Sequence, residues 1–294
     1  MTSLVAAAAP RRGTTGWLSA RWSARRVLRG PVAWLAWGTL VALSVLVLVG
    51  PLFVTADPQA QDSVALLPAG TAGHLLGTDD LGRDVLARVL AGGRPFLVVC
   101  AAATAASALI GTSLGLLAGF RGGWVDAVVM RAMDVLLAFP LVLVAILMVA
   151  VLGGGTGNMI VAITISQAPT FARLARNLTV GEVSRDYVRA SRCLGHGSWH
   201  IALREVLPNV SGQVLVQTTS TLAVTAGLSS ALSYLGLGQD ASAPDWGYMV
   251  RAGQELIFSN PGLSLIPALL ITAFAVAANF AGDDLRDATD LGRL

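Results

Sequence analysis

The sequence predicts an all-α, polytopic membrane protein with six transmembrane helices. Of its 294 residues, 54% are hydrophobic and only 13% are charged, which is about half the charged share of an ordinary soluble domain. The apolar residues lie in long uncharged runs, and a helix that crosses the hydrocarbon core needs about 20 of them. These observations argue against one large soluble core, and a mean hydropathy of +0.68 excludes a disordered chain.

Six apolar stretches approach or exceed the length of a membrane span. In chain order they are residues 32–54, 95–120, 135–152, 158–172, 210–235 and 263–281. The third continues a helix that begins near Trp124. The fourth is the weakest because Gln167 and Pro169 interrupt it, and a shallower re-entrant segment is its alternative. The first is longer than the apolar region of a secretion signal, so we interpret it as a retained anchor.

The distribution of arginine predicts the orientation of these spans. All 20 basic residues are Arg; if the N-terminus is cytoplasmic, inner segments carry 16 of them and outer segments 4. This asymmetry is typical of the positive-inside rule, and it places both termini and the basic loop 173–209 in the cytoplasm. The predicted organisation is a basic, amphipathic cytoplasmic tail (1–31), the first span (32–54), an outer loop (55–94), a core of five spans (95–282) and a cytoplasmic tail (283–294).

The span interiors argue against two other classes of function. None of the six stretches contains Asp, Glu, Arg or His, whereas carriers that work alone keep ionisable groups near the bilayer midplane. A membrane hydrolase is poorly supported because the chain has no G-x-S-x-G motif, no HExxH motif and no membrane-embedded His. His196 and His200 have an i, i+4 spacing that suits a metal, but the sequence shows no third ligand, so no metal site is predicted.

Small residues predict a close helix contact in the second span. Gly111, Gly115 and Gly119 recur every four residues, and Ser107 lies one turn earlier. Residues of this size let two helix backbones approach closely. The spacing alone does not distinguish packing within the chain from packing between two copies of it.

The outer loop predicts an interfacial helix ahead of the second span. Thr78 is a suitable N-cap, and Asp79 and Asp80 occupy the first turn, where the helix dipole favours anions. Gly92 and Gly93 would end this helix. Its apolar stripe consists of Leu81, Val85, Leu86, Val89 and Leu90. A helix of this pattern is expected to lie flat on the outer membrane surface.

Residues 181–209 have the pattern of a helix, a glycine turn and a second helix. Gly195 and Gly197 interrupt the first helical pattern. A second short helix is predicted over residues 198–206, ending at Pro208. The loop would therefore carry two short helices between the fourth and fifth spans.

The first of these helices carries a small, basic surface. Ala190 and Ser191 allow close docking, and Arg185, Arg189 and Arg192 surround them. A protein partner that docks here is one interpretation. The alternative is a solvated basic loop that only satisfies the positive-inside rule.

The motifs of this loop resemble the EAA loop of ABC-importer permeases, and most closely that of the dipeptide, oligopeptide and nickel group. They are Asp186-Tyr187-Val188-Arg189-Ala190-Ser191, Leu194-Gly195 and Leu207-Pro208-Asn209. Residues 77–86, 122–140 and 235–247 resemble further stretches of the same family in the same order, so the resemblance covers roughly residues 75–282. The long N-terminal tail is similar to that of the second of the family's two permease types. Ser191 and Glu205 stand where the family usually has Ala and Ile.

This resemblance implies the fold of a type I ABC importer permease, in which the basic loop is a coupling helix that docks in a cleft of an ATPase subunit. The residues carried over to that role are Arg185, Asp186, Tyr187, Arg189, Ala190, Ser191, Leu194, Gly195 and Pro208. On the outer side, contact with a solute-binding protein is the functional alternative to a plain membrane anchor. The residues concerned are Asp79, Asp80, Arg83, Asp84, Asp245 and Trp246.

The resemblance also implies partners and a location. The complex would contain a second homologous permease, two ATPase subunits or one fused ATPase, and an extracellular solute-binding protein, in a bacterial inner or plasma membrane. The chain itself is expected to be non-catalytic and to need no cofactor. ATP and Mg²⁺ would bind the ATPase, because a chain without Lys cannot supply the P-loop lysine. Apart from these subunits the partner is the lipid bilayer; nucleic-acid binding is not expected, because membrane proximity explains the arginines.

The expected function is therefore half of an ATP-driven pathway for di- and oligopeptides. Nickel or another small solute is the alternative substrate within the same class. A stand-alone secondary carrier or channel is the alternative from a different class, and a membrane enzyme is the third.

Overall fold

The computed structural model describes residues 30–54, 56–61, 63–239 and 242–290. Within these ranges the chain is all-α, as predicted, and its only β-pairings are two isolated bridges, Thr71–His74 and Thr78–Asp84. Most of the predicted basic tail (1–31) and the last residues of the C-terminal tail lie outside the described residues.

The described helices run from Pro31 to Asp290, and a long loop separates η2 from α3. They are α2 (Pro31–Val49), the 3₁₀ turn η2 (Gly50–Leu52), α3 (Val85–Arg121), α4 (Gly123–Leu137), α5 (Leu141–Leu152), α6 (Thr156–Val183), α7 (Asp186–Cys193), α8 (Ser198–His200), the π turn η3 (Ile201–Val206), α9 (Leu207–Tyr234), α10 (Trp246–Gln254) and α11 (Gly262–Asp290). The 37 residues of α3 make a rod of about 56 Å at 1.5 Å per residue.

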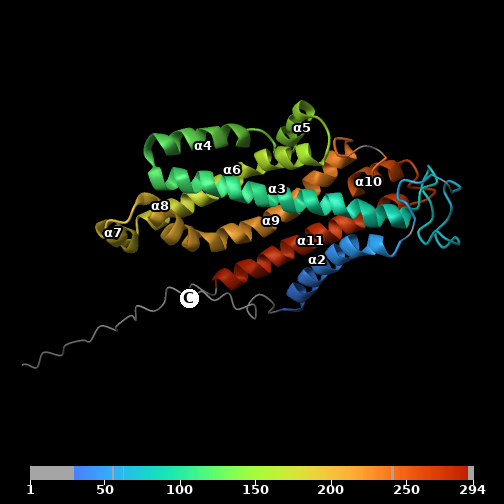
Figure 1. Ribbon diagram of the computed structural model, residues 1–294, viewed down its shortest axis with the longest axis horizontal. Helices are drawn as coiled ribbons and strands as arrows, with labels where there is room; N and C mark the ends of the chain where they lie inside the picture. Colours follow the sequence, from blue (N-terminus) through green and yellow to red (C-terminus); the bar gives the residue numbers. More distant parts are fainter. Residues whose placement is uncertain (1–29, 55, 62, 240–241, 291–294) are drawn as a thin grey trace, which may run out of the picture.

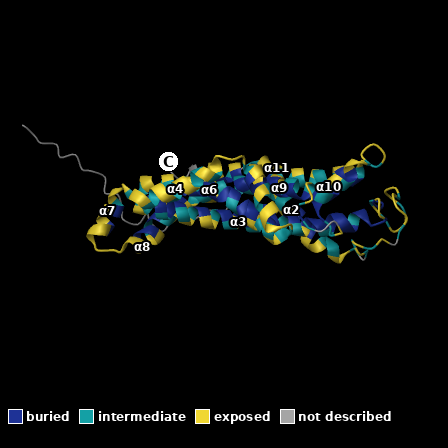
Figure 2. Cartoon of the chain, turned by 90° about the horizontal axis from the view of Figure 1, so that it is seen from above, coloured by how far each residue is buried: buried dark blue, intermediate teal, exposed yellow. Residues whose placement is uncertain are grey.

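Three long helices, α3, α6 and α9, lie side by side along the long axis of the molecule (Figure 1). Helices α4 and α5 contact the α6 side of this group, while α11 packs on α9 and α2 packs on α11. The α7–α8 region lies at one end of the elongated bundle, and α10 lies with the 56–84 loop at the other (Figures 1 and 2). The two loops that the sequence singled out are therefore far apart, at opposite ends of the same rods.

The glycine stripe of α3 packs within the chain, against α6. A Cβ atom on Gly111 would lie 2.4 Å from the carbonyl oxygen of Ala168, and one on Gly115 would lie 2.3 Å from that of Ala172. Both distances are far below van der Waals contact, so only glycine permits this approach. The small residues of α3 therefore serve packing within one chain, against α6, which the spacing alone could not distinguish from packing between two copies.

A small uncharged polar cluster lies between the three long helices. Thr104 of α3 and Thr225 of α9 are joined by a hydrogen bond of 2.9 Å between their hydroxyls. The side-chain amide of Gln167 in α6 donates to the same Thr225 oxygen at 2.8 Å, and Thr225 donates to the carbonyl oxygen of Thr221 at 2.8 Å. Each of these groups is buried and partnered, as apolar surroundings require.

In the part of the chain that the structure describes, three helices, over Pro31–Leu52, Val85–Arg121 and Gly262–Ala288, are long and apolar enough to cross a membrane, and α4 with α5 would make a fourth as one bent span. Helices α6 and α9, with 28 residues each, cover the fourth and fifth predicted spans. Helix α6 continues unbroken through Gln167 and Pro169, rather than turning back as a re-entrant segment. The count of six spans remains a prediction.

The third predicted span is bent much more sharply than expected. The helix that begins near Trp124 ends at Leu137, and α5 leaves at 93° to it. Pro140 explains the break, because proline lacks the N–H that would continue the helix and disfavours helical geometry in the residue before it. Helix α4 has no buried residue and is held to α6 by ion pairs, including Arg173–Asp134 at 2.6 Å.

The predicted interfacial helix of the outer loop is wrong as a separate element. The helix begins only at Val85, where the side chain of Asp84 caps it by accepting from the backbone N–H of Ala87 at 2.7 Å. It then runs through Gly92 and Gly93 into the second span. A Cβ on Gly93 would lie 2.3 Å from a methyl group of Val47, so the glycine pair permits close packing instead of ending the helix. Helix α11 likewise continues to Asp290, into the predicted cytoplasmic tail.

A substitution in the glycine stripe should damage the fold. We expect Gly115→Val to destabilise the protein by about 1–3 kcal/mol or more, because the new side chain overlaps the α6 backbone and α3 must move away from α6 to make room for it. The midpoint of chemical unfolding in detergent micelles measures the loss. The control is Gly227→Ala in α9, where an added Cβ meets nothing within 4 Å. Similar midpoints for the two variants would contradict the close contact.

Candidate functional site

The segment from Arg185 to Pro208, which we call the coupling segment after its predicted role, forms one end of the bundle (Figure 1). Helix α7 is followed by Gly195 with φ of +80°, a backbone conformation that favours glycine. After this turn, α8, η3 and α9 follow without a break, so the second short helix does not end at Pro208 as predicted. Proline is tolerated here because it stands in the first turn of α9, after the π turn.

A compact apolar cluster fixes the coupling segment on the bundle. Val188 of α7 is fully buried, and it belongs to the same cluster as Ile201 and Val206 of η3. Leu116 of α3 and Val210 of α9 complete this cluster. Helix α7 and the π turn η3 therefore share one core with the ends of two long helices.

Most of the predicted coupling residues are exposed at the surface of this end (Figure 2). The exposed ones are Arg185, Asp186, Arg189, Ala190, Leu194, Gly195 and Pro208. Leu194 exposes 76% of its surface and Trp199, which sequence reasoning did not select, exposes 62%. Apolar side chains that stand out beside arginines are typical of a protein-binding surface.

Tyr187 and Ser191 face inward and hold the segment together. The Tyr187 hydroxyl donates to Glu182 at 2.7 Å, and the side-chain amide of Asn209 donates to the Tyr187 oxygen at 3.2 Å. Burial, with the hydrogen bond to Glu182, raises the pKa of Tyr187 to about 12, so this side chain is a neutral donor at physiological pH. The Ser191 hydroxyl is shared between His196 and Glu205. These two coupling residues therefore position the exposed ones.

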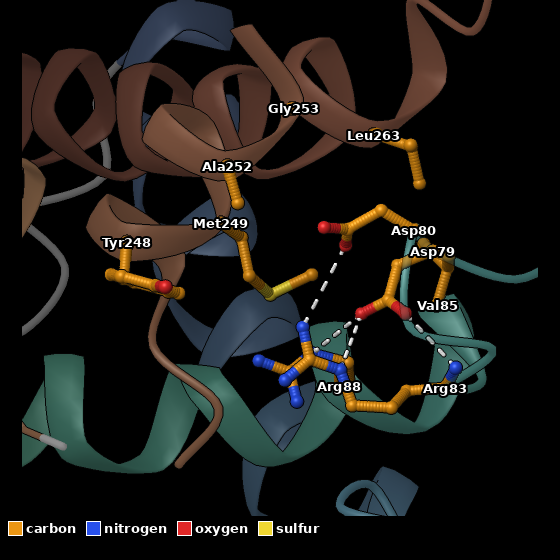
Figure 3. A pocket seen from close by; sticks show the side chains of 10 residues that line it. All are labelled: Asp79, Asp80, Arg83, Val85, Arg88, Tyr248, Met249, Ala252, Gly253 and Leu263. Atoms are coloured by element: carbon orange, nitrogen blue, oxygen red, sulfur yellow. Dashed lines mark hydrogen bonds and ion pairs between the residues drawn. The ribbon is translucent and has the colours of Figure 1, made fainter. Parts of the chain in front are cut away.

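The opposite end of the bundle holds a buried charge cluster, centred on Asp79 (Figure 3). One carboxylate oxygen of Asp79 accepts from the backbone N–H groups of Leu81 and Arg83, each at 2.9 Å. The other accepts from Arg83 Nε at 2.6 Å and lies 3.6 Å from Arg88 Nε. Two buried arginines and one carboxylate thus organise the turn that leads into α3, and they line a shallow pocket with Tyr248 and Met249.

Arg88 is a functional candidate that sequence reasoning missed, since it was counted only as one of the outer arginines. Its surface is 2% exposed, and one of its terminal amino groups donates to the carbonyl oxygens of Pro58 at 3.0 Å and Ser242 at 3.4 Å. It therefore joins the 56–61 segment and the loop before α10 to α3. The only sequence signal was a charge within the apolar stripe of Val85 and Val89.

The remaining outer residues are also tied into the chain. Asp84 accepts from the His74 ring at 2.8 Å if Nδ1 carries the proton, and Trp246 donates to the carbonyl oxygen of Val89 at 2.7 Å. Asp245 caps α10 and accepts from the Ser233 hydroxyl at 3.0 Å; its burial raises the pKa of the carboxyl above the usual range. Of the six residues predicted to face a binding protein, only Asp80 is exposed. The other five are Asp79, Arg83, Asp84, Asp245 and Trp246, all buried.

Comparison with known proteins shows which transport family this chain is similar to. A family described as the binding-protein-dependent transport system inner membrane component matches residues 111–287. The glutathione transport system permease protein of Pectobacterium atrosepticum is 38% identical over 220 residues, which are 75% of this chain and 73% of the relative. The di/tripeptide transport system permease protein of Pseudomonas aeruginosa is 39% identical over 76% of this chain and 74% of its own. The dipeptide transport system permease protein of Haemophilus influenzae is 34% identical over 89% of this chain and 90% of its own.

The buried charge cluster centred on Asp79 allows a prediction about stability. Asp79→Asn would leave Arg83 and Arg88 buried beside a neutral side chain, and we expect a loss of about 3 kcal/mol or more in the free energy of unfolding. Asp80→Asn is the matched control, because its half-exposed carboxylate lies 3.9 Å from Arg83 and should contribute less than about 1 kcal/mol. Chemical unfolding in detergent micelles measures both. Equal losses would show that Asp79 has no special part in the cluster.

Proposed function

Because the chain belongs to the family of binding-protein-dependent transport system inner membrane components, we propose that it is one of two permease subunits of an ATP-driven ABC importer for short peptides. It forms half of the translocation pathway in a bacterial inner membrane. ATP is hydrolysed on partner ATPase subunits, and an extracellular solute-binding protein delivers the substrate.

The substrate class rests on the names of the relatives. They are permeases of systems that transport glutathione, di- and tripeptides, and dipeptides. All of these are short peptides, so di- and oligopeptides are the proposed cargo.

The observation that carries the proposal is the mechanical continuity of the coupling segment with α9. Ala190 of α7 and Leu194 just after it are exposed, while Val188 of α7 shares a core with η3. From η3 the chain continues directly into the 28 residues of α9. A partner that moves α7 would therefore tilt α9 as a rod, and α9 contributes Thr225 to the polar cluster. ATP-driven closure of two ATPase subunits would supply such a movement.

At the end proposed to face outward, exposed and buried residues have different roles. Asp80 is the predicted contact residue that is open to a solute-binding protein, and it belongs to the turn that Asp79 and Arg83 organise. The buried residues shape this surface instead of touching the partner. The exposed residues of this loop would thus recognise the solute-binding protein, and its buried charged residues would keep the loop rigid.

The proposed membrane arrangement has six spans with both termini in the cytoplasm. Helices α6 and α9 are the fourth and fifth spans; each contacts α3 as well as the other, so they need less apolar surface than helices that face lipid. The second, homologous permease would complete the pathway. Two ATPase subunits, or one fused ATPase, would dock on the two coupling segments.

The coupling role predicts a loss of transport without loss of the protein. Gly195→Pro should abolish uptake and substrate-stimulated ATP hydrolysis, because proline cannot adopt a φ of +80° and the turn after α7 must change. Gly195→Asn is the matched control, since asparagine tolerates the left-handed conformation. Ala190→Arg should also block docking of the ATPase, whereas Ala190→Ser keeps the surface small. Normal ATPase stimulation in both disruptive variants would refute the coupling role.

The proposed energy source and substrate predict the behaviour of the reconstituted complex. In proteoliposomes, a labelled dipeptide should accumulate only when ATP, the ATPase and the binding protein are all present. Uptake driven by an ion gradient through this chain alone would instead identify a secondary carrier. An excess of unlabelled tripeptide should compete with the dipeptide if the system accepts short peptides as a class.

A further inference from the structure

We infer that His196, His200 and Glu205 form a binding site for a divalent transition-metal ion, of which Zn²⁺ is the type. The coordinating atoms of these three side chains all lie within 4.8 Å of one another. His196 Nδ1 is 3.7 Å from a carboxylate oxygen of Glu205, and the two imidazole rings are 4.6 Å apart between centroids. Both histidines are exposed and Glu205 is half-buried, so an ion can reach the site from solvent.

The π turn is what brings the third ligand into place. His200 and Glu205 are five residues apart, and in an α-helix that separation points two side chains about 140° away from each other. In the π turn η3 (Ile201–Val206), backbone hydrogen bonds join residues five apart, which turns such a pair toward one face. Turns of this kind are rare, and they occur frequently at functional sites. The local winding therefore gives the histidine pair a carboxylate that its sequence spacing did not reveal.

The donor set suits the proposed ion. Two imidazoles and one carboxylate are a common protein ligand set for Zn²⁺ that leaves one position open. Ligands at about 2.0 Å around a tetrahedral ion lie roughly 3.4 Å apart, so atoms that are at most 4.8 Å apart need to approach by no more than about 1.4 Å. Rotation of the exposed imidazoles provides this movement.

Ser191 already links two of the proposed ligands. Its hydroxyl is hydrogen-bonded to His196 Nδ1 at 2.8 Å and also donates to Glu205. An ion bound at these two atoms would take the place of the hydroxyl as their common partner. The site joins the turn at Gly197 to η3, because His196 precedes that glycine whereas His200 and Glu205 follow it. A bound ion would hold the turn in one geometry.

The test uses the full-length permease, without an affinity tag that contains histidine, in lipid nanodiscs. Titration with Co²⁺ followed by visible absorption, and then displacement by Zn²⁺, should show one ion per chain. His200→Gln and Glu205→Gln should each weaken binding at least about tenfold, since removing even an outer partner of a ligand costs 10–100-fold. The matched control is Glu255→Gln, an exposed glutamate in the α10 region, at the opposite end of the bundle. Its affinity should equal that of the unchanged chain.

Three results would overturn the site. They are unchanged affinity in either ligand variant, loss of binding in Cys193→Ser, and absence of any one-to-one binding. Hydrogen exchange of the unchanged chain provides a test that does not depend on how well a variant folds. Saturating Zn²⁺ should slow backbone hydrogen exchange over residues 194–206 without slowing it around Glu255, and binding without this local protection would place the ion elsewhere. None of these measurements needs the ATPase, so they stand apart from a test of the proposed transport function.

Discussion

The direct contact between the backbones of α3 and α6 is the constraint on which the rest of the structure depends. Gly111 and Gly115 bring α3 so close that a single Cβ would meet the carbonyl oxygens of α6 at 2.4 and 2.3 Å. This contact lets Gln167 reach the hydroxyl of Thr225 in α9. It also aligns the ends of the long helices, where the coupling segment and the outer loop are attached (Figure 1).

The two ends of the bundle differ in which kind of group is buried and which is exposed. At the end that carries the loop before α3, charge is buried, and its desolvation is offset because Asp79 interacts with two arginines and two backbone N–H groups together. At the other end, the apolar surface is left open on Leu194 and Trp199, beside exposed arginines. The first arrangement makes a loop rigid without a hydrophobic core of its own. The second leaves unburied surface that a partner subunit would cover.

Predictions from the sequence were right for features that depend on local composition, and they were wrong for features that depend on packing between distant segments. Apolar runs and the glycine turn after α7 were visible because spans and left-handed turns need particular residues nearby. The prediction that Gly92 and Gly93 end a helix was wrong because distant segments explain both: Gly92 packs against the backbone of Pro244 and Asp245, and Gly93 packs against Val47 and Trp246. The burial of Arg88 and the approach of Glu205 to two histidines could not be predicted, since one depends on loops far along the chain and the other on an unusual helical winding.

The π turn also has a consequence for how this protein tolerates changes in length. Such a turn is one additional residue wound into an otherwise α-helical path. Deleting a residue between Ile201 and Val206 would restore ordinary winding, and the five remaining residues at about 100° each would cover nearly the same total rotation as the six residues of the π turn, which wind less per residue. Val188 would therefore keep its direction toward the apolar cluster. This turn can thus absorb a change of one residue in chain length, whereas the same deletion in the regular part of a helix would rotate everything on one side of it by about 100°.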